Sequence, residues 1–566
     1  MRKKLPISTD DFQTIIDGGC YFVDKSMFIA EVLENMFETK LILRPRRFGK
    51  SLNMSMLKAF LEIGSPVGLF EGLAISGQKG LCAEHQGKHP VIYLSFKDMR
   101  ANSFSQVLDL LASCVWEEAE RLGISQYAPG LSNRDQLTLS RLDSPHATEN
   151  DVAASIYLMA KMLNRSYGKK AVVLIDEYDA PINQAYQNEY YDDITRLFRN
   201  MLGKALKGNR YVSFAVMTGV LRISKDSIFS DLNNIRAYSA LDERCSAHFG
   251  FTEGEVAAML GYYGIEERMP EMKAFYDGYK IGSYEMYNPW SVVNACYDML
   301  TDRISDLEKY WINTGSNDLV REMLMRDGFE ALSSIEDLAN GGTIKKSLSI
   351  FATYRDLIDT PSSEAVWDMM FMSGYLTWVK KAAKDKYELR APNLEVREAL
   401  RKDALSWAKS AMPINKGDAD KLLMALLAGN AEGAEAVIND LFEKILSVKD
   451  GVVVHGDFKI DKERHYHLIT SALLACSSWD VESEAESGDG YADIICTNET
   501  LDAAVIVEEK FSRSKGDKSL AKQAEEAIEQ IVGTRYAKSV EGFSTVAAVG
   551  IAYESRRCKI AIRQLR

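Results

Sequence analysis

The strongest constraint on the fold is a series of short, nearly continuous apolar segments separated by helical periodicity in the first 250 residues. These segments are residues 40–43, 90–96, 171–175 and 211–217. A strand that is covered on both faces is apolar throughout, and such strands alternating with helices form a parallel sheet. The sequence therefore predicts a doubly wound α/β domain over residues 1–250.

A loop with the character of a phosphate-binding loop follows the first apolar segment. It reads RPRRFGKS over residues 44–51, and a helix with apolar residues at helical spacing begins there. Such a loop cradles phosphates with backbone N–H groups, while its lysine and hydroxyl reach the terminal phosphates and Mg²⁺. The motif GxxxxGK[ST] has glycine where this chain has Arg44, but Gly49, Lys50 and Ser51 keep the functional end.

Two further strands end in polar residues that suit the same site. Asp176 and Glu177 close the segment 171–175, so that one acid can approach magnesium and the other can orient or deprotonate water. Thr218 ends the segment 211–217 and could sense the γ-phosphate, with Arg222 available to neutralise charge. Solvated acids and ordinary loop chemistry are the alternatives. The order of the motifs on successive strands favours an ATP site.

The tail of the chain carries a second group of acids in a strand pattern. Asp493 lies in one predicted strand, and Glu508 and Lys510 lie in the next. Residues two apart on a strand project to the same face, so Glu508 and Lys510 can share a site with Asp493, while Glu509 points to the opposite face. Metal-dependent phosphodiester cleavage uses carboxylates and a lysine in this way. A charged strand edge is the alternative.

The middle of the chain has a different pattern, with shorter predicted helices and turns. A capping box at Thr252–Glu255 opens one helix, residues 276–282 resemble a small β-hairpin, and Asn288–Pro289 opens another helix. Residues 300–450 read mainly as amphipathic helix. We expect four parts: an ATPase domain (1–250), a winged-helix-like lid region (251–345), a helical connector (346–450) and a C-terminal α/β domain (451–566).

Composition excludes several classes of protein. With a formal net charge of -13, the chain is not one that coats nucleic acid through a general positive field, although a locally basic groove stays possible. Eight scattered cysteines without a CxxC pair fit reduced thiols. His465 and His467 lack partner cysteines and are expected to be helix-surface residues. With no signal-peptide core and no long apolar stretch, we expect a cytoplasmic protein without membrane association.

Longer motifs resemble the AAA-ATPase-like family of prokaryotic proteins, whose members commonly carry a C-terminal nuclease-like domain of the PD-(D/E)XK superfamily. The motifs are residues 44–52, 174–182, 218–225, 249–252, 276–279 and 287–290. The resemblance implies an N-terminal P-loop sheet of the ASCE or AAA type and a C-terminal fold like that of restriction endonucleases. It also implies ATP and Mg²⁺ as cofactors.

The same resemblance assigns roles to individual residues. In the first site, Lys50 would contact the β/γ-phosphates, Ser51 and Asp176 would hold magnesium, and Glu177 would activate water. The nucleotide-binding set comprises Arg47, Phe48, Gly49, Lys50, Ser51, Leu52, Asp176, Thr218 and Arg222. In the second site, Glu484, Asp493 and Glu508 would be metal ligands and Lys510 would position the water. Tyr491 and Glu509 depart from the usual pattern.

The sequence thus predicts an ATPase fused to a magnesium-dependent nuclease that acts on DNA rather than RNA, in defence or in the handling of mobile DNA. The chain could form a homo-oligomer. The alternative is a nucleotide-switched regulatory or scaffold protein whose tail binds nucleic acid or a partner without cleavage. A chaperone-like remodeller driven by ATP is a third reading.

Overall fold

The chain folds into two compact units. In this computed structural model, residues 2–34, 39–124, 131–221, 235–301, 307–311, 331, 334–349, 356, 364–411, 415–447, 463–487, 490–512, 516–534, 536–554 and 557–566 are described. Unit 1 comprises Met1–Ser316 and Thr343–Val396, and unit 2 comprises Asn317–Gly342 and Arg397–Arg566.

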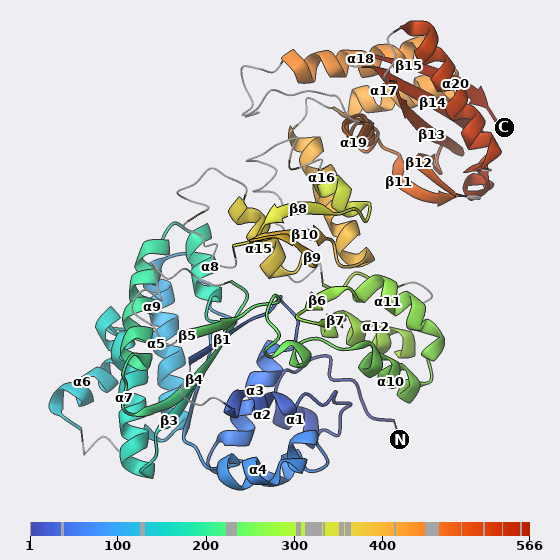
Figure 1. Ribbon diagram of the computed structural model, residues 1–566. Helices are drawn as coiled ribbons and strands as arrows, with labels where there is room; N and C mark the ends of the chain where they lie inside the picture. Colours follow the sequence, from blue (N-terminus) through green and yellow to red (C-terminus); the bar gives the residue numbers. More distant parts are fainter. Residues whose placement is uncertain are drawn as a thin grey trace. The chain divides into compact units, whose positions relative to one another are not determined.

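A five-stranded parallel sheet forms the centre of unit 1 (Figure 1). Its strands are β1 (Thr39–Leu43), β2 (Val91–Ser95), β3 (Ala171–Asp176), β4 (Val212–Gly219) and β5 (Ile235–Tyr238). Their order is β2-β3-β4-β1-β5, with every pairing parallel. This confirms the doubly wound α/β prediction. The sequence pattern missed β5, which is short and half-buried at the sheet edge.

Helices connect and cover these strands. They are α1 (Phe12–Asp17), α2 (Met27–Leu33), α3 (Lys50–Leu61), α4 (Lys79–His85), α5 (Phe104–Arg121), α6 (Asn133–Leu142), α7 (Glu149–Tyr167), α8 (Ala180–Gln187) and α9 (Tyr191–Leu206). One core cluster contains α3 side chains together with Ile42 of β1, Val172 and Leu174 of β3, and Val216 of β4. Alternate residues of each strand therefore face this core, as the period of a strand requires.

A smaller helical region follows the sheet. It contains α10 (Glu253–Tyr263), α11 (Met269–Tyr276), β6 (Tyr279–Ile281), β7 (Tyr284–Met286) and α12 (Pro289–Thr301). The capping box of α10 is present in full. The expected hairpin is also present as the antiparallel pair β6 and β7, and Gly282 adopts a φ of 55° at its turn.

Within the region expected to be mainly helical, the structure also places a three-stranded antiparallel sheet. Its strands are β8 (Ile344–Ser347), β9 (Thr377–Ala383) and β10 (Lys386–Arg390), in the order β8-β10-β9, with α15 (Glu364–Ser373) before β9. The strands are short and rich in lysine, so they lack the apolar runs that reveal buried strands. The helix α16 (Leu394–Ala411) follows.

Unit 2 carries the expected C-terminal α/β domain. Its elements are α17 (Lys416–Leu427), α18 (Ala431–Ser447), α19 (Glu463–Leu474), β11 (Asp480–Ser487), β12 (Gly490–Asn498), β13 (Ala503–Phe511), α20 (Asp517–Gly533), β14 (Thr545–Glu554) and β15 (Arg557–Gln564). The sheet order is β11-β12-β13-β14-β15, and only β13 and β14 are parallel. Gly550 lets α20 approach this sheet, because a Cβ there would lie 1.9 Å from the carbonyl oxygen of Ala524.

Two other expectations concern the whole chain. All eight cysteines are free thiols, as their spacing predicted. Among the described helices, none is both long enough and apolar enough to cross a membrane.

Candidate nucleotide and metal sites

The loop between β1 and α3 has the backbone conformation of a tight phosphate-binding turn. Gly49 adopts a φ of 76° and Arg47 a φ of 68°, so both lie in the left-handed region. A non-glycine residue rarely adopts this conformation, and such residues concentrate at functional sites. The first turn of α3 then begins at Lys50. The loop thus directs the amino end of a helix toward the position of the phosphates.

Arg44, the residue that replaces the first glycine of the loop motif, is a buried structural cation. Its guanidinium group donates hydrogen bonds to the carbonyl oxygens of Leu43 (2.8 Å), Tyr238 (2.9 Å) and Cys245 (3.0 Å). Burial lowers the pKa of Arg44 to about 10, so the group stays charged at neutral pH. Arginine at this position therefore connects the start of the loop to the end of β5 and to the segment after it.

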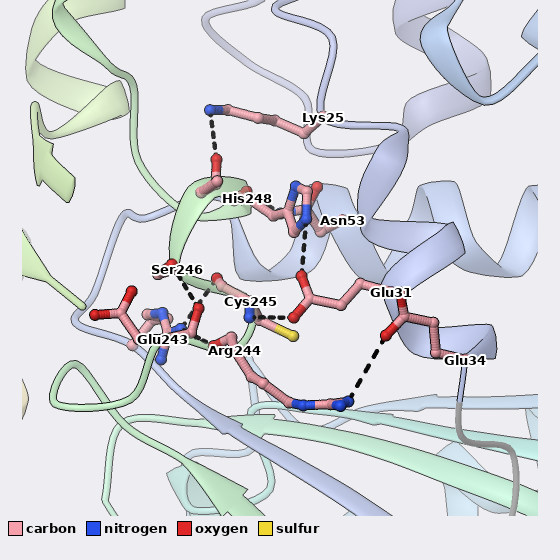
Figure 2. Close-up of polar contacts among 11 residues, drawn as sticks. Lys25, Glu31, Glu34, Asn53, Glu243, Arg244, Cys245, Ser246 and His248 are labelled. Atoms are coloured by element: carbon pink, nitrogen blue, oxygen red, sulfur yellow. Dashed lines mark hydrogen bonds and ion pairs between the residues drawn. The ribbon is translucent and has the colours of Figure 1, made fainter. Parts of the chain in front are cut away.

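That segment is also held from the side of α2 and α3 (Figure 2). Glu31 accepts a hydrogen bond from the backbone N–H of Cys245 (2.7 Å) and contacts Nε2 of His248 (3.0 Å). Asn53, in the first turns of α3, donates from Nδ2 to the carbonyl oxygen of His248 (2.8 Å). The loop and its helix are thus braced by one segment, residues 243–248, that no sequence motif had indicated.

Lys50 lies folded inside the loop. Its Nζ atom is 3.0 Å from the carbonyl oxygen of Pro45 and 3.3 Å from that of Arg44. Burial lowers the pKa of Lys50, while the charges of Glu177, Asp179 and Asp176 oppose that effect. The ammonium group is therefore enclosed by the loop it would serve, and a phosphate group could replace these carbonyl contacts.

Ser51 at the start of α3, Asp176 at the end of β3 and Thr218 near the end of β4 meet at one point. Ser51 Oγ donates to Asp176 Oδ2 (2.6 Å), and Thr218 Oγ1 donates to Asp176 Oδ1 (2.5 Å). Burial raises the pKa of Asp176, and these two hydrogen bonds oppose the rise. A hydroxyl and a carboxylate oxygen at this spacing are ligands that suit Mg²⁺.

Four residues of the predicted ATP site remain: Glu177, the predicted water-activating residue, and Phe48, Leu52 and Arg222 of the nucleotide-binding set. Glu177 has a φ of 51°, and its backbone N–H lies 3.3 Å from Thr218 Oγ1. The side chains of Phe48 and Leu52 pack inside the protein, Phe48 against Tyr279 at a ring distance of 4.8 Å, so only their backbone could face a nucleotide. Arg222 lies outside the described residues.

The loop also packs against the residues that follow the main sheet. The guanidinium group of Arg47 lies 4.1 Å from the ring centre of Trp290, at the start of α12. Gly374, with a φ of 100°, approaches Pro45 so closely that a Cβ would lie 2.9 Å from the proline ring. The start of α12 and the residue after α15 therefore contact this loop directly.

In unit 2, the strand register places the predicted metal ligands in one row. β12 pairs with β13 from Ile494 opposite Val507, so the next position brings Asp493 opposite Glu508. β11 pairs with β12 such that Glu484 takes the position opposite Asp493. Residues directly opposite in neighbouring strands share a face of the sheet. The side chain of Glu484 lies outside the described part of the chain.

The described side chains of this row fit a divalent cation. Glu508 Oε2 is buried with no hydrogen-bond partner among the described residues, while Glu508 Oε1 lies 3.1 Å from Lys510 Nζ. Lys510 is held in turn by Gln530 Oε1 (2.6 Å). Burial, with repulsion from Glu509 and Glu508, raises the pKa of Asp493 to about 7. An unpartnered carboxylate oxygen beside a second carboxylate is a donor set for a hard cation. Within the described residues, no group of three acid, histidine or cysteine side chains converges.

Comparisons with known proteins match each of the two regions that contain these residues to a family. Residues 6–229 match the family described as "Predicted AAA-ATPase", and residues 461–562 match the PD-(D/E)XK nuclease superfamily. The chain joins an AAA-ATPase-like domain to a PD-(D/E)XK domain. A protein of Azotobacter chroococcum mcd 1, described as "Uncharacterized protein in vnfD 5'region", is 29% identical over 451 residues, or 78% of each chain.

Tyr178 and Asp179, which lie in the motif of residues 174–182, hold the end of β4. Asp179 Oδ2 accepts the backbone N–H groups of Val220 (2.9 Å) and Leu221 (2.8 Å), and Tyr178 Oη donates to the carbonyl oxygen of Leu221 (2.6 Å). A Cβ on Gly219 would lie 2.6 Å from the Tyr178 ring. These two residues clamp the end of β4, which fixes the Thr218 hydroxyl against Asp176.

The PD-(D/E)XK domain corrects one expectation, because His467 is not a surface residue. Its side chain is 16% exposed, and its Nδ1 lies 2.7 Å from Glu509 Oε2. Tyr553 Oη donates to the other oxygen of Glu509 (2.8 Å), and the backbone N–H of Glu509 donates to Asp493 Oδ2 (2.6 Å). Glu509 does face away from Glu508, so the helix α19 covers the opposite face of β13 and buries His467 against it.

Breaking the pair of His467 and Glu509 should destabilise unit 2. The variant His467→Gln leaves Glu509 buried without its cation, which typically costs about 3–5 kcal/mol. Burial alone would lower the pKa of His467, but the hydrogen bond and charge of Glu509 raise it from 6.5 to about 9. Because folding raises the pKa of His467, protonated His467 stabilises the folded state fully below pH 6.5. This stabilisation disappears as the pH rises through about 9.

Hydrogen exchange of β13 in the full chain, measured from pH 6 to pH 10, checks this prediction. In the wild-type protein, the protection of the β13 amides should fall between pH 6 and pH 10. In His467→Gln these amides should be less protected, and their protection should depend little on pH. The double variant His467→Gln/Glu509→Gln, which keeps a neutral hydrogen bond, should recover much of the loss. Equal protection of His467→Gln and wild type would refute the stabilising role.

Proposed function

We propose that this protein binds and hydrolyses ATP in its AAA-ATPase-like domain and cleaves DNA with Mg²⁺ in its PD-(D/E)XK domain. The observation that carries the proposal is the row formed by Asp493 and Glu508, with an unpartnered buried oxygen on Glu508 and Lys510 beside it. The role in defence or mobile-DNA handling that the sequence suggested belongs to the same proposal and rests on the resemblance.

At the nuclease site, each residue has a distinct task. Asp493, Glu508 and, by its register position, Glu484 would hold Mg²⁺, which when bound would polarise the phosphodiester and its water. Lys510 Nζ is held by Gln530 and Glu508 at the edge of the row, so its ammonium group can orient an attacking water. His467 and Tyr553 fix Glu509, whose backbone N–H holds Asp493 in place.

At the ATP site, residues at the sheet edge would bind the phosphates, hold Mg²⁺ and accept a proton. The backbone of residues 47–51 would bind the phosphates, and Lys50 would exchange its carbonyl contacts for the β/γ-phosphates. Ser51 and Asp176 would hold the Mg²⁺ that accompanies ATP. Glu177 follows Asp176 directly after β3 in a left-handed backbone conformation, and its carboxylate would receive a proton from water.

The test is cleavage of labelled linear and circular DNA by the full chain with Mg²⁺ or Mn²⁺, compared with EDTA, in the presence of ATP, ADP or no nucleotide. Wild type should cleave only with metal, and Asp493→Asn should not cleave. The control Glu499→Gln neutralises an exposed acid after β12 and should cleave as wild type does.

Two outcomes would refute the nuclease. One is intact DNA under every metal and nucleotide condition, and the other is wild-type cleavage by Asp493→Asn. Either result, combined with normal ATP binding, would favour the nucleotide-switched scaffold in its place.

A further inference from the structure

β9 and β10 form a hairpin within the three-stranded sheet of unit 1, in which β8 pairs along the other side of β10. Every residue from Lys380 to Lys386 is exposed, although successive residues of a strand point to opposite faces. Both faces of the sheet are therefore exposed over this stretch. The base of the hairpin is fixed, because Leu389 and Thr377 are buried and Thr377 Oγ1 accepts the backbone N–H of Lys280 (2.8 Å).

The sheet that contains this hairpin is strongly basic. The cationic residues of its three strands and their turn are Lys345, Lys346, Lys380, Lys381, Lys384, Lys386 and Arg390, and the acidic residues are Asp385 and Glu388. Of these two acids, Glu388 lies within ion-pair distance of Lys380, at 3.3 Å, and Lys380 is 68% exposed there. In a chain with a net charge of -13, this concentration of positive charge is local.

The strand register distributes the charge over both faces. Tyr387 lies opposite Lys346 and Lys381, and Glu388 lies opposite Lys345 and Lys380. Lys381 Nζ is 5.6 Å from the ring centre of Tyr387. One face thus combines an aromatic ring with Lys381 and with Lys346, whose Nζ lies 4.6 Å from the ring centre of Trp367, and the other combines two lysines with one acid.

The exposed lysines of β9 and its turn suit the phosphate backbone of a nucleic-acid duplex. The proposed nuclease function makes that duplex DNA. Because the chain as a whole is acidic, binding must come from such a local cationic element and not from a general field.

We propose that the hairpin of residues 377–390 is the surface through which this protein holds the phosphate backbone of double-stranded DNA. The proposal deepens the proposed nuclease function, on which it rests for the choice of DNA as substrate, and it assigns the contact to unit 1 and not to the nuclease domain.

The test is DNA binding by the full chain in EDTA, where metal-dependent cleavage cannot occur, measured by the fluorescence anisotropy of a labelled 20-base-pair duplex at several salt concentrations. The variant Lys381→Gln/Lys384→Gln/Lys386→Gln should bind at least 10-fold more weakly at low salt. Its slope of log affinity against log salt should be shallower by about 0.9 for each phosphate that the variant no longer neutralises.

The matched control is Lys79→Gln/Lys88→Gln/Lys170→Gln, which removes the same charge from exposed positions elsewhere in unit 1. It should bind as wild type does. Circular dichroism melting of both variants checks that they fold. Equal affinity of the hairpin variant and the control would overturn the proposal, and so would tighter, hairpin-dependent binding of duplex RNA or no DNA binding by wild type.

The experiments distinguish a failure of the nuclease proposal from a failure of the hairpin proposal. If wild type cleaves DNA while the hairpin variant binds like the control, the hairpin proposal is wrong and the nuclease stands. If the hairpin variant loses binding while wild type never cleaves, the DNA-binding surface stands and the nuclease is wrong.

Discussion

Glu508→Gln should abolish both metal binding and DNA cleavage, whereas Lys510→Met should abolish cleavage and leave metal binding almost unchanged. Glu508 Oε2 is a buried oxygen without a partner, so the loss of its charge removes a ligand that nothing else in the described row can replace. Lys510 Nζ contacts Gln530 and Glu508, and its removal takes away the group that orients water. Loss of a positioned proton-transfer group costs roughly 10²–10⁴-fold in rate.

Titration calorimetry with Mn²⁺ and cleavage rates of the full chain distinguish these effects. Gln530→Leu is a useful third variant, because it frees Lys510 without touching a carboxylate and should lower the rate while Mn²⁺ still binds. Undiminished Mn²⁺ affinity in Glu508→Gln would remove this residue from the ligand set. Unchanged cleavage by Lys510→Met would remove the lysine from the chemistry.

ATP binding should weaken strongly when Lys50 is replaced by alanine. The ammonium group is enclosed by the loop, with carbonyl contacts of 3.0 and 3.3 Å that a phosphate can replace. A hydrogen bond to a charged group contributes about 1.5–3 kcal/mol, which corresponds to roughly 10–100-fold weaker binding. Equilibrium binding of a fluorescent ATP analogue measures this change.

The control for Lys50→Ala is Lys58→Ala, on the same helix about 12 Å farther along its axis, which should bind ATP normally. Ser51→Ala should retain nucleotide but lose the dependence of affinity on Mg²⁺. Wild-type ATP affinity in Lys50→Ala would show that this loop is not a phosphate site, and the AAA-ATPase-like domain would then need another role.

Some residues of the two candidate sites were predictable from the sequence, and others were not. Lys50, Ser51 and Asp176 were predictable because each follows or precedes an apolar run that ends at the same sheet edge. Asp493, Glu508 and Lys510 were predictable from the alternation of side chains along two strands. These signals are local, since they depend on residues within a few positions of one another.

Other parts of the sites depend on contacts between distant segments. Arg44 read as a defect of the loop motif, yet its hydrogen bonds reach residues 238 and 245. Tyr178 and Asp179 clamp residues more than forty positions later, and His467 meets Glu509 across forty-two positions. The periodicity of the sequence does not predict such partners. The residues around a charged side chain show the same pattern whether that side chain is solvated or paired with a distant residue.

The amino-acid sequence by itself predicted four of the five strands of the main sheet, the loop that follows β1 and the acids at the strand ends, because apolar periodicity encodes which residues are buried. Only the tertiary structure decided that Arg44 braces the loop, that His467 is buried against Glu509, and that the lysines between residues 380 and 386 are exposed at one side of a three-stranded sheet. Pairing and exposure of charges are set by which distant segments pack together, and the free energy of a buried charge depends on that packing.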